Sequence, residues 1–179
     1  MIMEESLLKI VKYAGKAPSG HNTQPWKFKT GKDTITVLPD FTRALPVVDS
    51  DNHALYISIG CALENLIIAA NELNFKTEVE FAGDKREPHI LVRISEAPET
   101  EKSDLFDYIE KRQVTRNSYR PEKIPDDLLS ELFNEAEGIH VRLFLSEDEI
   151  NSLTPYIIEG NELQFSNKEF VNELVNWIR

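Results

Sequence analysis

The sequence predicts an α+β protein in which helices flank a central sheet of mixed or antiparallel strands. Apolar residues recur at helical spacing in several segments, and the strand-like segments come in pairs instead of alternating regularly with helices. The chain has 179 residues, of which 41% are hydrophobic and 28% are charged, as in a globular domain with its own core. We therefore expect one domain over residues 1–179.

The first part of the chain is expected to form a helix, a hairpin, a long helix and two more strands. Leu7, Ile10 and Ala14 give the first helix an apolar side, and Gly15 and Pro18 end it. A turn at Gly31-Lys32 joins two runs of alternating polarity. In chain order these elements are a helix at 4–15, strands at 24–30 and 33–38, a helix at 51–73, and strands at 76–81 and 89–95.

The remaining elements follow the polar linker "EAPETEKSD". Pro125-Asp126-Asp127 opens a helix, because proline suits the first turn and acids suit its positive end. Ser166 and Glu169 have the spacing of a capping box and predict the start of the last helix. The expected elements are a helix at 103–111, the helix opened at 125–127, a strand at 139–145, and helices at 147–160 and 167–178.

The helix expected at 51–73 is apolar on most of its sides. Such a helix is buried inside the domain or between subunits. The last helix also has one apolar side, which the chain has no later strand to cover. A monomer would leave an apolar patch exposed. We therefore predict a homodimer, or a dimer-like pairing with the C-terminal part of a longer chain, with the 51–73 helix at or near the contact.

Charge and cysteine content exclude several classes of partner. The chain has 20 Lys and Arg against 31 Asp and Glu, a net charge of −11, which argues against nucleic acid and anionic membranes. No apolar run approaches the roughly 20 residues of a membrane span, and the N-terminus lacks the pattern of a signal peptide. The single cysteine, Cys61, suits a reducing compartment and predicts a cytoplasmic protein.

No set of residues in the sequence predicts a metal site or a catalytic residue. The four histidines lie far apart without ligand spacing, and there is no dinucleotide fingerprint, phosphate-binding lysine loop or Ser/His/Asp set. Any chemistry would therefore come from an organic cofactor. Five basic residues gather in "KRQVTRNSYRPEK", which on spacing alone is more typical of a solvated helix end than of an anion site.

The segment "APSGHNTQPWKF" at 17–28 resembles the P-S-x-x-N-x-Q-P-W loop of the nitroreductase-like, FMN-binding family. A loop of this composition offers a planar ring both packing surfaces and hydrogen-bonding groups. The alternative from composition alone is a capped turn beside a core tryptophan. The resemblance implies FMN as cofactor, with Gln24 and Trp26 also bracing the loop. In this loop it implies contacts to the flavin by Pro18, Ser19, Gly20, Asn22 and Gln24.

Two further segments extend the resemblance to the Acg-like branch of this family, in which two nitroreductase-like halves share one chain. Residues 43–66 are similar to its R-x-L-x-x-x-D and S-x-G-A-A-L-x-N-L elements, with Cys61 replacing an alanine. The basic cluster resembles its R-R-[ST]-x-R signature, which implies phosphate binding by Arg112, Gln113, Thr115 and Arg116. The branch implies a first half at 1–98 and the start of a second at 103–179. Because related two-half proteins are longer, the chain is expected to be either a fragment or a shortened member of the branch.

The resemblance implies an FMN-dependent oxidoreductase. NAD(P)H would be the electron donor, and a nitroaromatic or quinone-type small molecule would be the electron acceptor. The flavin carries the chemistry, so no protein residue is expected to be catalytic. Two alternatives remain: a protein that stores or sequesters FMN without efficient turnover, and a chain that has lost the cofactor and serves as an interaction domain.

Overall fold

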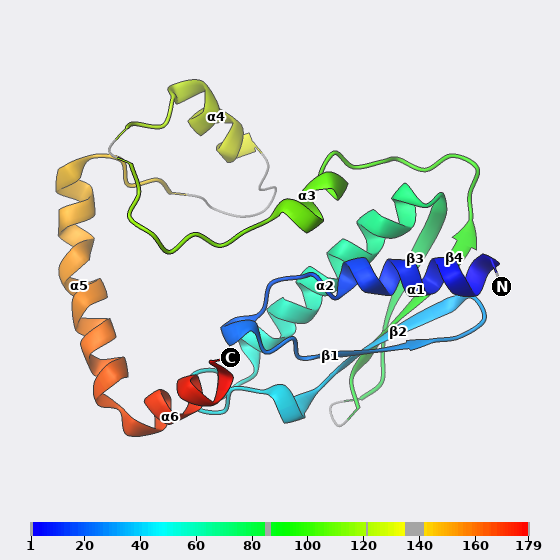
Figure 1. The fold of residues 1–179 in the computed structure, drawn as a ribbon, viewed down its shortest axis with the longest axis horizontal. Helices are drawn as coiled ribbons and strands as arrows, with labels where there is room; N and C mark the ends of the chain where they lie inside the picture. The colour runs from blue at the N-terminus through cyan, green and yellow to red at the C-terminus, as the bar shows by residue number, and fades with distance from the viewer. Residues whose placement is uncertain (1, 85–86, 121, 135–141, 179) are drawn as a thin grey trace. The chain divides into compact units, whose positions relative to one another are not determined.

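The computed structural model describes residues 2–84, 87–120, 122–134 and 142–178. Within them the chain forms α-helices, short 3-10 helices (η) and one antiparallel sheet, which confirms the α+β class (Figure 1). In chain order the elements are α1 (Ile2–Ala14), η1 (Gly20–Asn22), β1 (Trp26–Thr30), β2 (Thr34–Pro39), η2 (Phe41–Arg43), α2 (His53–Glu72), β3 (Phe75–Ala82), β4 (His89–Glu96), α3 (Phe106–Lys111), α4 (Asp126–Asn134), α5 (Glu147–Ser166) and α6 (Lys168–Trp177).

The chain divides into two compact units. Unit 1 combines residues 1–112 with residues 168–179, so the last helix returns to the first part of the chain. Unit 2 comprises residues 113–167 and holds α4 and α5. A capping box starts α5, in which Ser146 Oγ accepts from the Glu149 amide and the Glu149 carboxylate accepts from the Ser146 amide.

The sheet of unit 1 has the strand order β1-β2-β4-β3, and every neighbouring pair is antiparallel. The hairpin predicted at Gly31-Lys32 joins β1 to β2, with Trp26 opposite Pro39 and Thr30 opposite Ile35. The Gly31 amide donates to the Thr34 carbonyl at 2.8 Å. A Cβ on Gly31 would lie 2.3 Å from Thr34 Oγ1, so a side chain at this position would force the Thr34 side chain to move.

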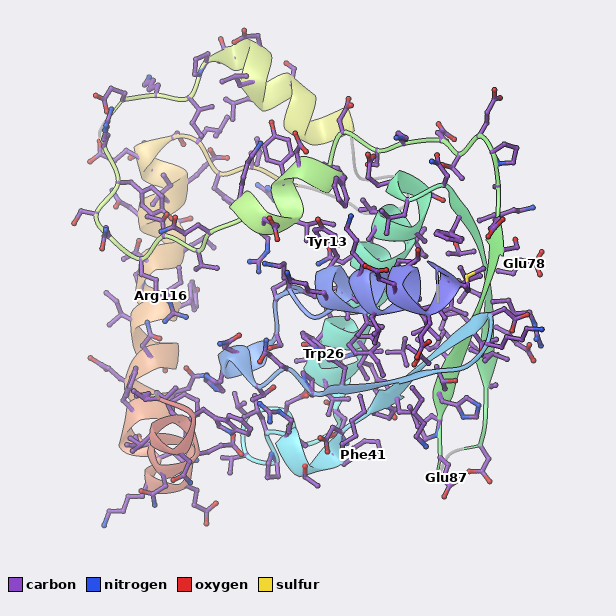
Figure 2. All side chains as sticks on the ribbon, turned by 45° about the vertical axis from the view of Figure 1, so that its right-hand side comes forward. Tyr13, Trp26, Phe41, Glu78, Glu87 and Arg116 are labelled. Carbon is purple, nitrogen blue, oxygen red and sulfur yellow. The ribbon has the colours of Figure 1, made fainter. Side chains whose placement is uncertain are left out.

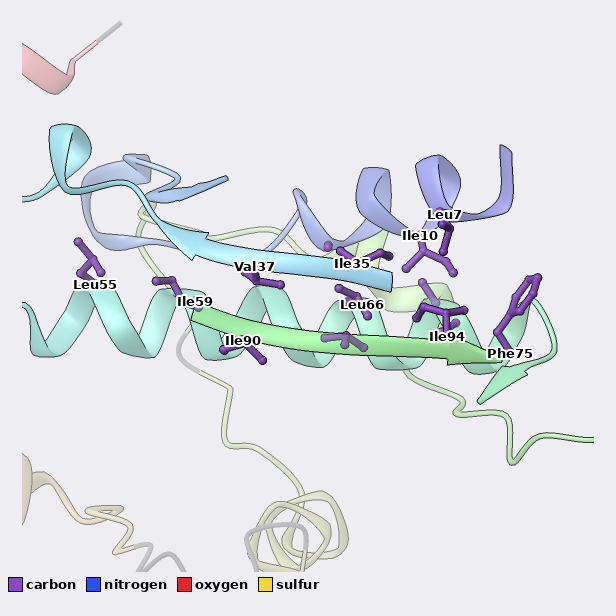
Figure 3. Close-up of a cluster of buried hydrophobic side chains, with 14 residues drawn as sticks. Leu7, Ile10, Ile35, Val37, Leu55, Ile59, Leu66, Phe75, Ile90 and Ile94 are labelled. Carbon is purple, nitrogen blue, oxygen red and sulfur yellow. The ribbon is translucent and has the colours of Figure 1, made fainter. Parts of the chain in front are cut away.

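The core of unit 1 lies between one face of the sheet and the helices α1 and α2. Ile35 and Val37 of β2 and Ile90 and Ile94 of β4 alternate with more exposed residues, as a sheet with one buried face requires (Figure 3). The helices cover that face with Leu7, Ile10, Leu55, Ile59, Leu66, Ala69 and Ala70.

Helix α2 alone among the described helices is long and apolar enough to cross a membrane by length and composition. Most of its buried residues instead join the core cluster of unit 1, as those of a core helix would. The N-terminal half of α2 keeps an exposed stripe at helical spacing, formed by His53, Tyr56, Ile57, Gly60 and Glu64. A Cβ on Gly60 would meet no atom within 4 Å, so this side of the helix is open.

Two sequence expectations fail in the described residues. Residues 142–145 are not a strand, and residues 139–141 of that predicted strand lie outside the described part of the chain. The predicted capping box at Ser166 and Glu169 is wrong. Ser166 is the last residue of α5, which runs six residues beyond its predicted end, and its hydroxyl donates to the Leu163 carbonyl at 2.8 Å.

Candidate functional site

The loop between α1 and β1 contains a tight turn at residues 19–24, hereafter the 19–24 turn. His21, Asn22 and Gln24 have φ values of 46°, 55° and 52°, in the left-handed region that residues with a Cβ seldom occupy. Each such residue costs about 1–3 kcal/mol unless its surroundings fix it. Three of them within four residues indicate a backbone that neighbouring contacts must hold.

Hydrogen bonds within the loop fix part of this backbone. The amides of Asn22 and Thr23 donate to the carbonyls of Ser19 and Gly20, at 3.0 and 2.9 Å. The Gln24 amide donates to Ser19 Oγ at 2.9 Å, and Gln24 Nε2 reaches the Gly15 carbonyl at 3.4 Å. Ser19 and Gln24 therefore both brace the turn, while the side chains of Pro18 and Asn22 are exposed and available to a ligand.

The segment at 43–49 holds the turn from a second side. Arg43 Nε donates to the Thr23 carbonyl, and Leu45 lies so close to Gly20 that a Cβ there would be 3.2 Å from Leu45 Cδ1. The buried Asp49 carboxylate accepts from the amides of Ala54 and Leu55, at 2.9 Å each, at the start of α2. These three residues form the R-x-L-x-x-x-D element, which here links the turn to α2.

An open cleft of about 450 Å³ lies beside the turn in unit 1. Trp26, labelled in Figure 2, and Phe28 give it aromatic surface from β1, and Gln24 contributes an amide. The remaining lining residues are Val11, Lys12, Gly15 and Lys16 from α1 and its end, with Asp40 and Arg43 from the segment after β2. Aromatic surface beside an amide and several cations suits a planar ring carrying an anionic group.

Asp40 anchors one wall of this cleft. Its Oδ1 accepts from Thr42 Oγ1 at 2.6 Å and pairs with Lys27 Nζ at 2.9 Å. Burial raises the pKa of Asp40, but the hydrogen bonds from Thr42 and Lys27 and the charge of Lys27 outweigh it, so the pKa lies below its ordinary value. Asp40 therefore stays ionised at neutral pH and offers no proton to a substrate.

The structure brings together some of the predicted site residues. Arg112, at the end of α3, is exposed and its Nη2 donates to the Lys16 carbonyl at 3.3 Å, next to the loop that holds Pro18, Ser19, Gly20, Asn22 and Gln24. Gln113, Thr115 and Arg116 belong to unit 2, and their side chains are exposed (Arg116 is labelled in Figure 2).

Sequence reasoning missed three cations that line the cleft: Lys12, Lys16 and Arg43. Arg43 belongs to the R-x-L-x-x-x-D element, but no feature of the sequence indicates its contact with the turn. Lys16 follows the end of α1 and pairs with Glu110 at 3.0 Å, and no motif in the sequence distinguishes it from other surface lysines. In the described residues, no group of three or more His, Cys, Asp or Glu is arranged to hold a metal ion.

Comparison with curated proteins finds relatives along nearly the whole chain. A Mycobacterium tuberculosis protein described as an NAD(P)H nitroreductase is 23% identical over 178 residues, which cover 97% of this chain and 51% of the relative. The Acg protein of the same organism, also described as an NAD(P)H nitroreductase, is 26% identical over 98 residues, covering 55% of this chain and 30% of Acg. The chain spans about half the length of the first of these relatives. No family model matches it.

Comparison with solved structures returns proteins with nitroreductase or NADH oxidase descriptions. One is an NADH oxidase from Clostridium acetobutylicum, with a TM-score of 0.45, 17% identity and coverage of 64% of this chain and 89% of that chain. Another is a nitroreductase from Exiguobacterium sibiricum in complex with FMN, with a TM-score of 0.38, 16% identity and coverage of 70% and 84%.

Proposed function

We propose that this chain is a nitroreductase-like, FMN-dependent oxidoreductase that takes electrons from NAD(P)H and passes them to a small-molecule acceptor. The observation that carries the proposal is the 19–24 turn beside a cleft with aromatic and cationic walls. The similarity to mycobacterial NAD(P)H nitroreductases over 97% of the chain supports it. Nitroaromatic or quinone-type compounds are the acceptor class we propose.

The chemistry of the residues present fits FMN. A cleft of about 450 Å³ is within the usual range of ligand sites, about 300–1,000 Å³. Trp26 and Phe28 offer apolar surface to a ring system, and Gln24 offers both a donor and an acceptor. Lys12, Lys16 and Arg43 add positive charge to the cleft, which favours an anionic ligand.

We assign binding and orientation to the residues of the chain. The exposed Pro18 and Asn22 would contact the ring system, and Ser19, Gly20 and Gln24 would fix the turn that presents them. The match to the R-R-[ST]-x-R signature supports phosphate binding by Arg112, Gln113, Thr115 and Arg116. FMN when bound supplies the hydride and electron transfer, so the protein needs to position it and restrict water.

The alternative function is FMN storage or sequestration, which an open binding site without catalytic residues favours. Measuring NAD(P)H turnover distinguishes the oxidoreductase from this alternative. The FMN-loaded protein is expected to oxidise NADH or NADPH steadily when a quinone or nitroaromatic acceptor is added, as followed by nicotinamide absorbance. FMN-loaded protein with NAD(P)H but without the added acceptor, and NAD(P)H with free FMN and the acceptor but without protein, are the controls. If the loaded protein oxidised NAD(P)H no faster than free FMN does, the storage function would replace the oxidoreductase.

We further propose a cytoplasmic homodimer in which the exposed stripe of α2 meets its counterpart. Tyr56 and Ile57 are 45% and 55% exposed, and the adjacent Gly60 would allow close approach of two helices. Ile57→Asp is expected to shift the protein from dimer to monomer, because it would place a charge in an apolar interface. Light scattering on dilute protein measures the mass directly.

The matched control for this prediction is Leu8→Asp on α1, since Leu8 is 57% exposed and lies outside the α2 stripe. This control is expected to keep the mass of the unmodified protein. A monomeric unmodified protein, or an Ile57→Asp variant with unchanged mass, would show that the stripe is not the subunit contact.

A further inference from the structure

Helix α6 contacts the segments that hold the 19–24 turn, although it lies more than 120 residues later in the chain. Three α6 residues at helical spacing face these segments: Phe170, Glu173 and Trp177. Phe170 and Glu173 are 8% and 9% exposed. Residues three or four positions apart share one face of a helix, so a single face of α6 makes all these contacts.

Each of the three residues reaches the turn by a different route. The Phe170 ring lies 6.5 Å from the ring of His21, within the turn itself. The Trp177 ring lies 5.4 Å from the guanidinium carbon of Arg43, whose Nε donates to the Thr23 carbonyl. Trp177 therefore acts on the turn through Arg43.

Glu173 fixes the segment that follows Arg43. Its two carboxylate oxygens accept from the amides of Val47 and Val48, at 2.9 and 3.1 Å. These amides follow Leu45, the residue that lies against Gly20. Replacing this nearly buried carboxylate is expected to destabilise the segment, because two backbone amides would each lose a hydrogen-bond acceptor.

We propose that α6 is the element that holds the 19–24 turn in its cofactor-binding conformation, with Glu173 and Trp177 as positioning residues. The turn has three non-glycine residues with positive φ, and such a backbone persists only where surrounding contacts fix it. The hydrogen bonds within the loop supply some of these contacts, and α6 supplies the rest through His21, Arg43 and the 47–48 amides. The cofactor half of this inference rests on the proposed function.

Amide hydrogen exchange tests the positioning role without any cofactor. The amides of Asn22, Thr23 and Gln24 are hydrogen-bonded within the turn, and the Ile94 amide, bonded to the Asp33 carbonyl at 2.8 Å, reports on the sheet. Trp177→Leu is expected to accelerate exchange at residues 22–24 by about three- to tenfold, the range of a lost cation–π contact. Glu173→Gln should act in the same direction, and Ile94 should be unchanged in both.

Two variants serve as controls. Trp177→Phe keeps an aromatic face for Arg43 and should restore most of the protection of residues 22–24. Asn176→Ala alters an exposed α6 residue and should change nothing. Unchanged exchange at residues 22–24 in Trp177→Leu would overturn the proposal. Equal acceleration at Ile94 would also overturn it, because α6 would then support unit 1 as a whole.

Titration with FMN tests the cofactor half separately. The dissociation constant is expected to rise about three- to tenfold in Trp177→Leu and to recover in Trp177→Phe. Faster exchange at residues 22–24 with unchanged FMN affinity would contradict a role of the turn in cofactor binding. If the unmodified protein failed to bind FMN, the proposed function would fall, while the exchange measurements would still decide whether α6 holds the turn.

Discussion

Leu66→Ala is expected to lower the free energy of unfolding of unit 1 by about 2–5 kcal/mol. Leu66 lies in the middle of α2 with no exposed surface and belongs to the core between α2 and the sheet (Figure 3). The substitution removes buried apolar atoms and leaves a cavity. Urea unfolding followed by tryptophan fluorescence measures the change in unit 1, because both tryptophans, Trp26 and Trp177, belong to it.

Leu8→Ala is the matched control for this core prediction. Leu8 is on α1 and 57% exposed, so the same change in side chain should alter stability by no more than about 0.5 kcal/mol. Both variants are compared without FMN and at one protein concentration, because any ligand binding or self-association would also shift apparent stability. Equal losses in the two variants would show that α2 is not the core helix.

Arg112→Ala and Arg116→Ala are each expected to weaken FMN binding by roughly ten- to hundredfold. A lost hydrogen bond to a charged group costs about 1.5–3 kcal/mol, and 1.4 kcal/mol corresponds to a tenfold change in affinity. Calorimetric titration of FMN into each variant measures the effect. Arg120→Ala, in the same exposed basic segment but without an assigned contact, is the control and should leave the affinity unchanged. Unchanged affinity in both single variants would show that the basic segment does not bind the phosphate and is an ordinary solvated helix end.

The sequence predicted most elements of unit 1 because their signals are local. Gly31 between two segments of alternating polarity was enough to predict the hairpin. The helical spacing of apolar residues was enough to predict α2. Local signals also produced the capping-box error. The S-x-x-E pattern occurs at both Ser146 and Ser166, but Ser166 is part of α5, so only the first of the two starts a helix.

Contacts between distant segments account for what the sequence could not predict about the site. The Val47 amide donates to the Glu173 carboxylate, which lies 126 residues later in the chain. Nothing in the sequence of α6 identifies Val47 as that partner. The residues with positive φ in the 19–24 turn are His21, Asn22 and Gln24, none of them glycine, so the usual signal for such a backbone is missing. The motif located the loop, and packing against Arg43 and α6 shapes it.

Retention of flavin by the purified protein tests the proposed function most directly. The protein is incubated with FMN or with FAD, passed through gel filtration and examined by flavin absorbance and fluorescence. We predict that FMN stays with the protein, and that FAD is retained less because the chain carries no dinucleotide fingerprint. Loss of FMN from the protein in this experiment, or equal retention of FAD, would contradict the account.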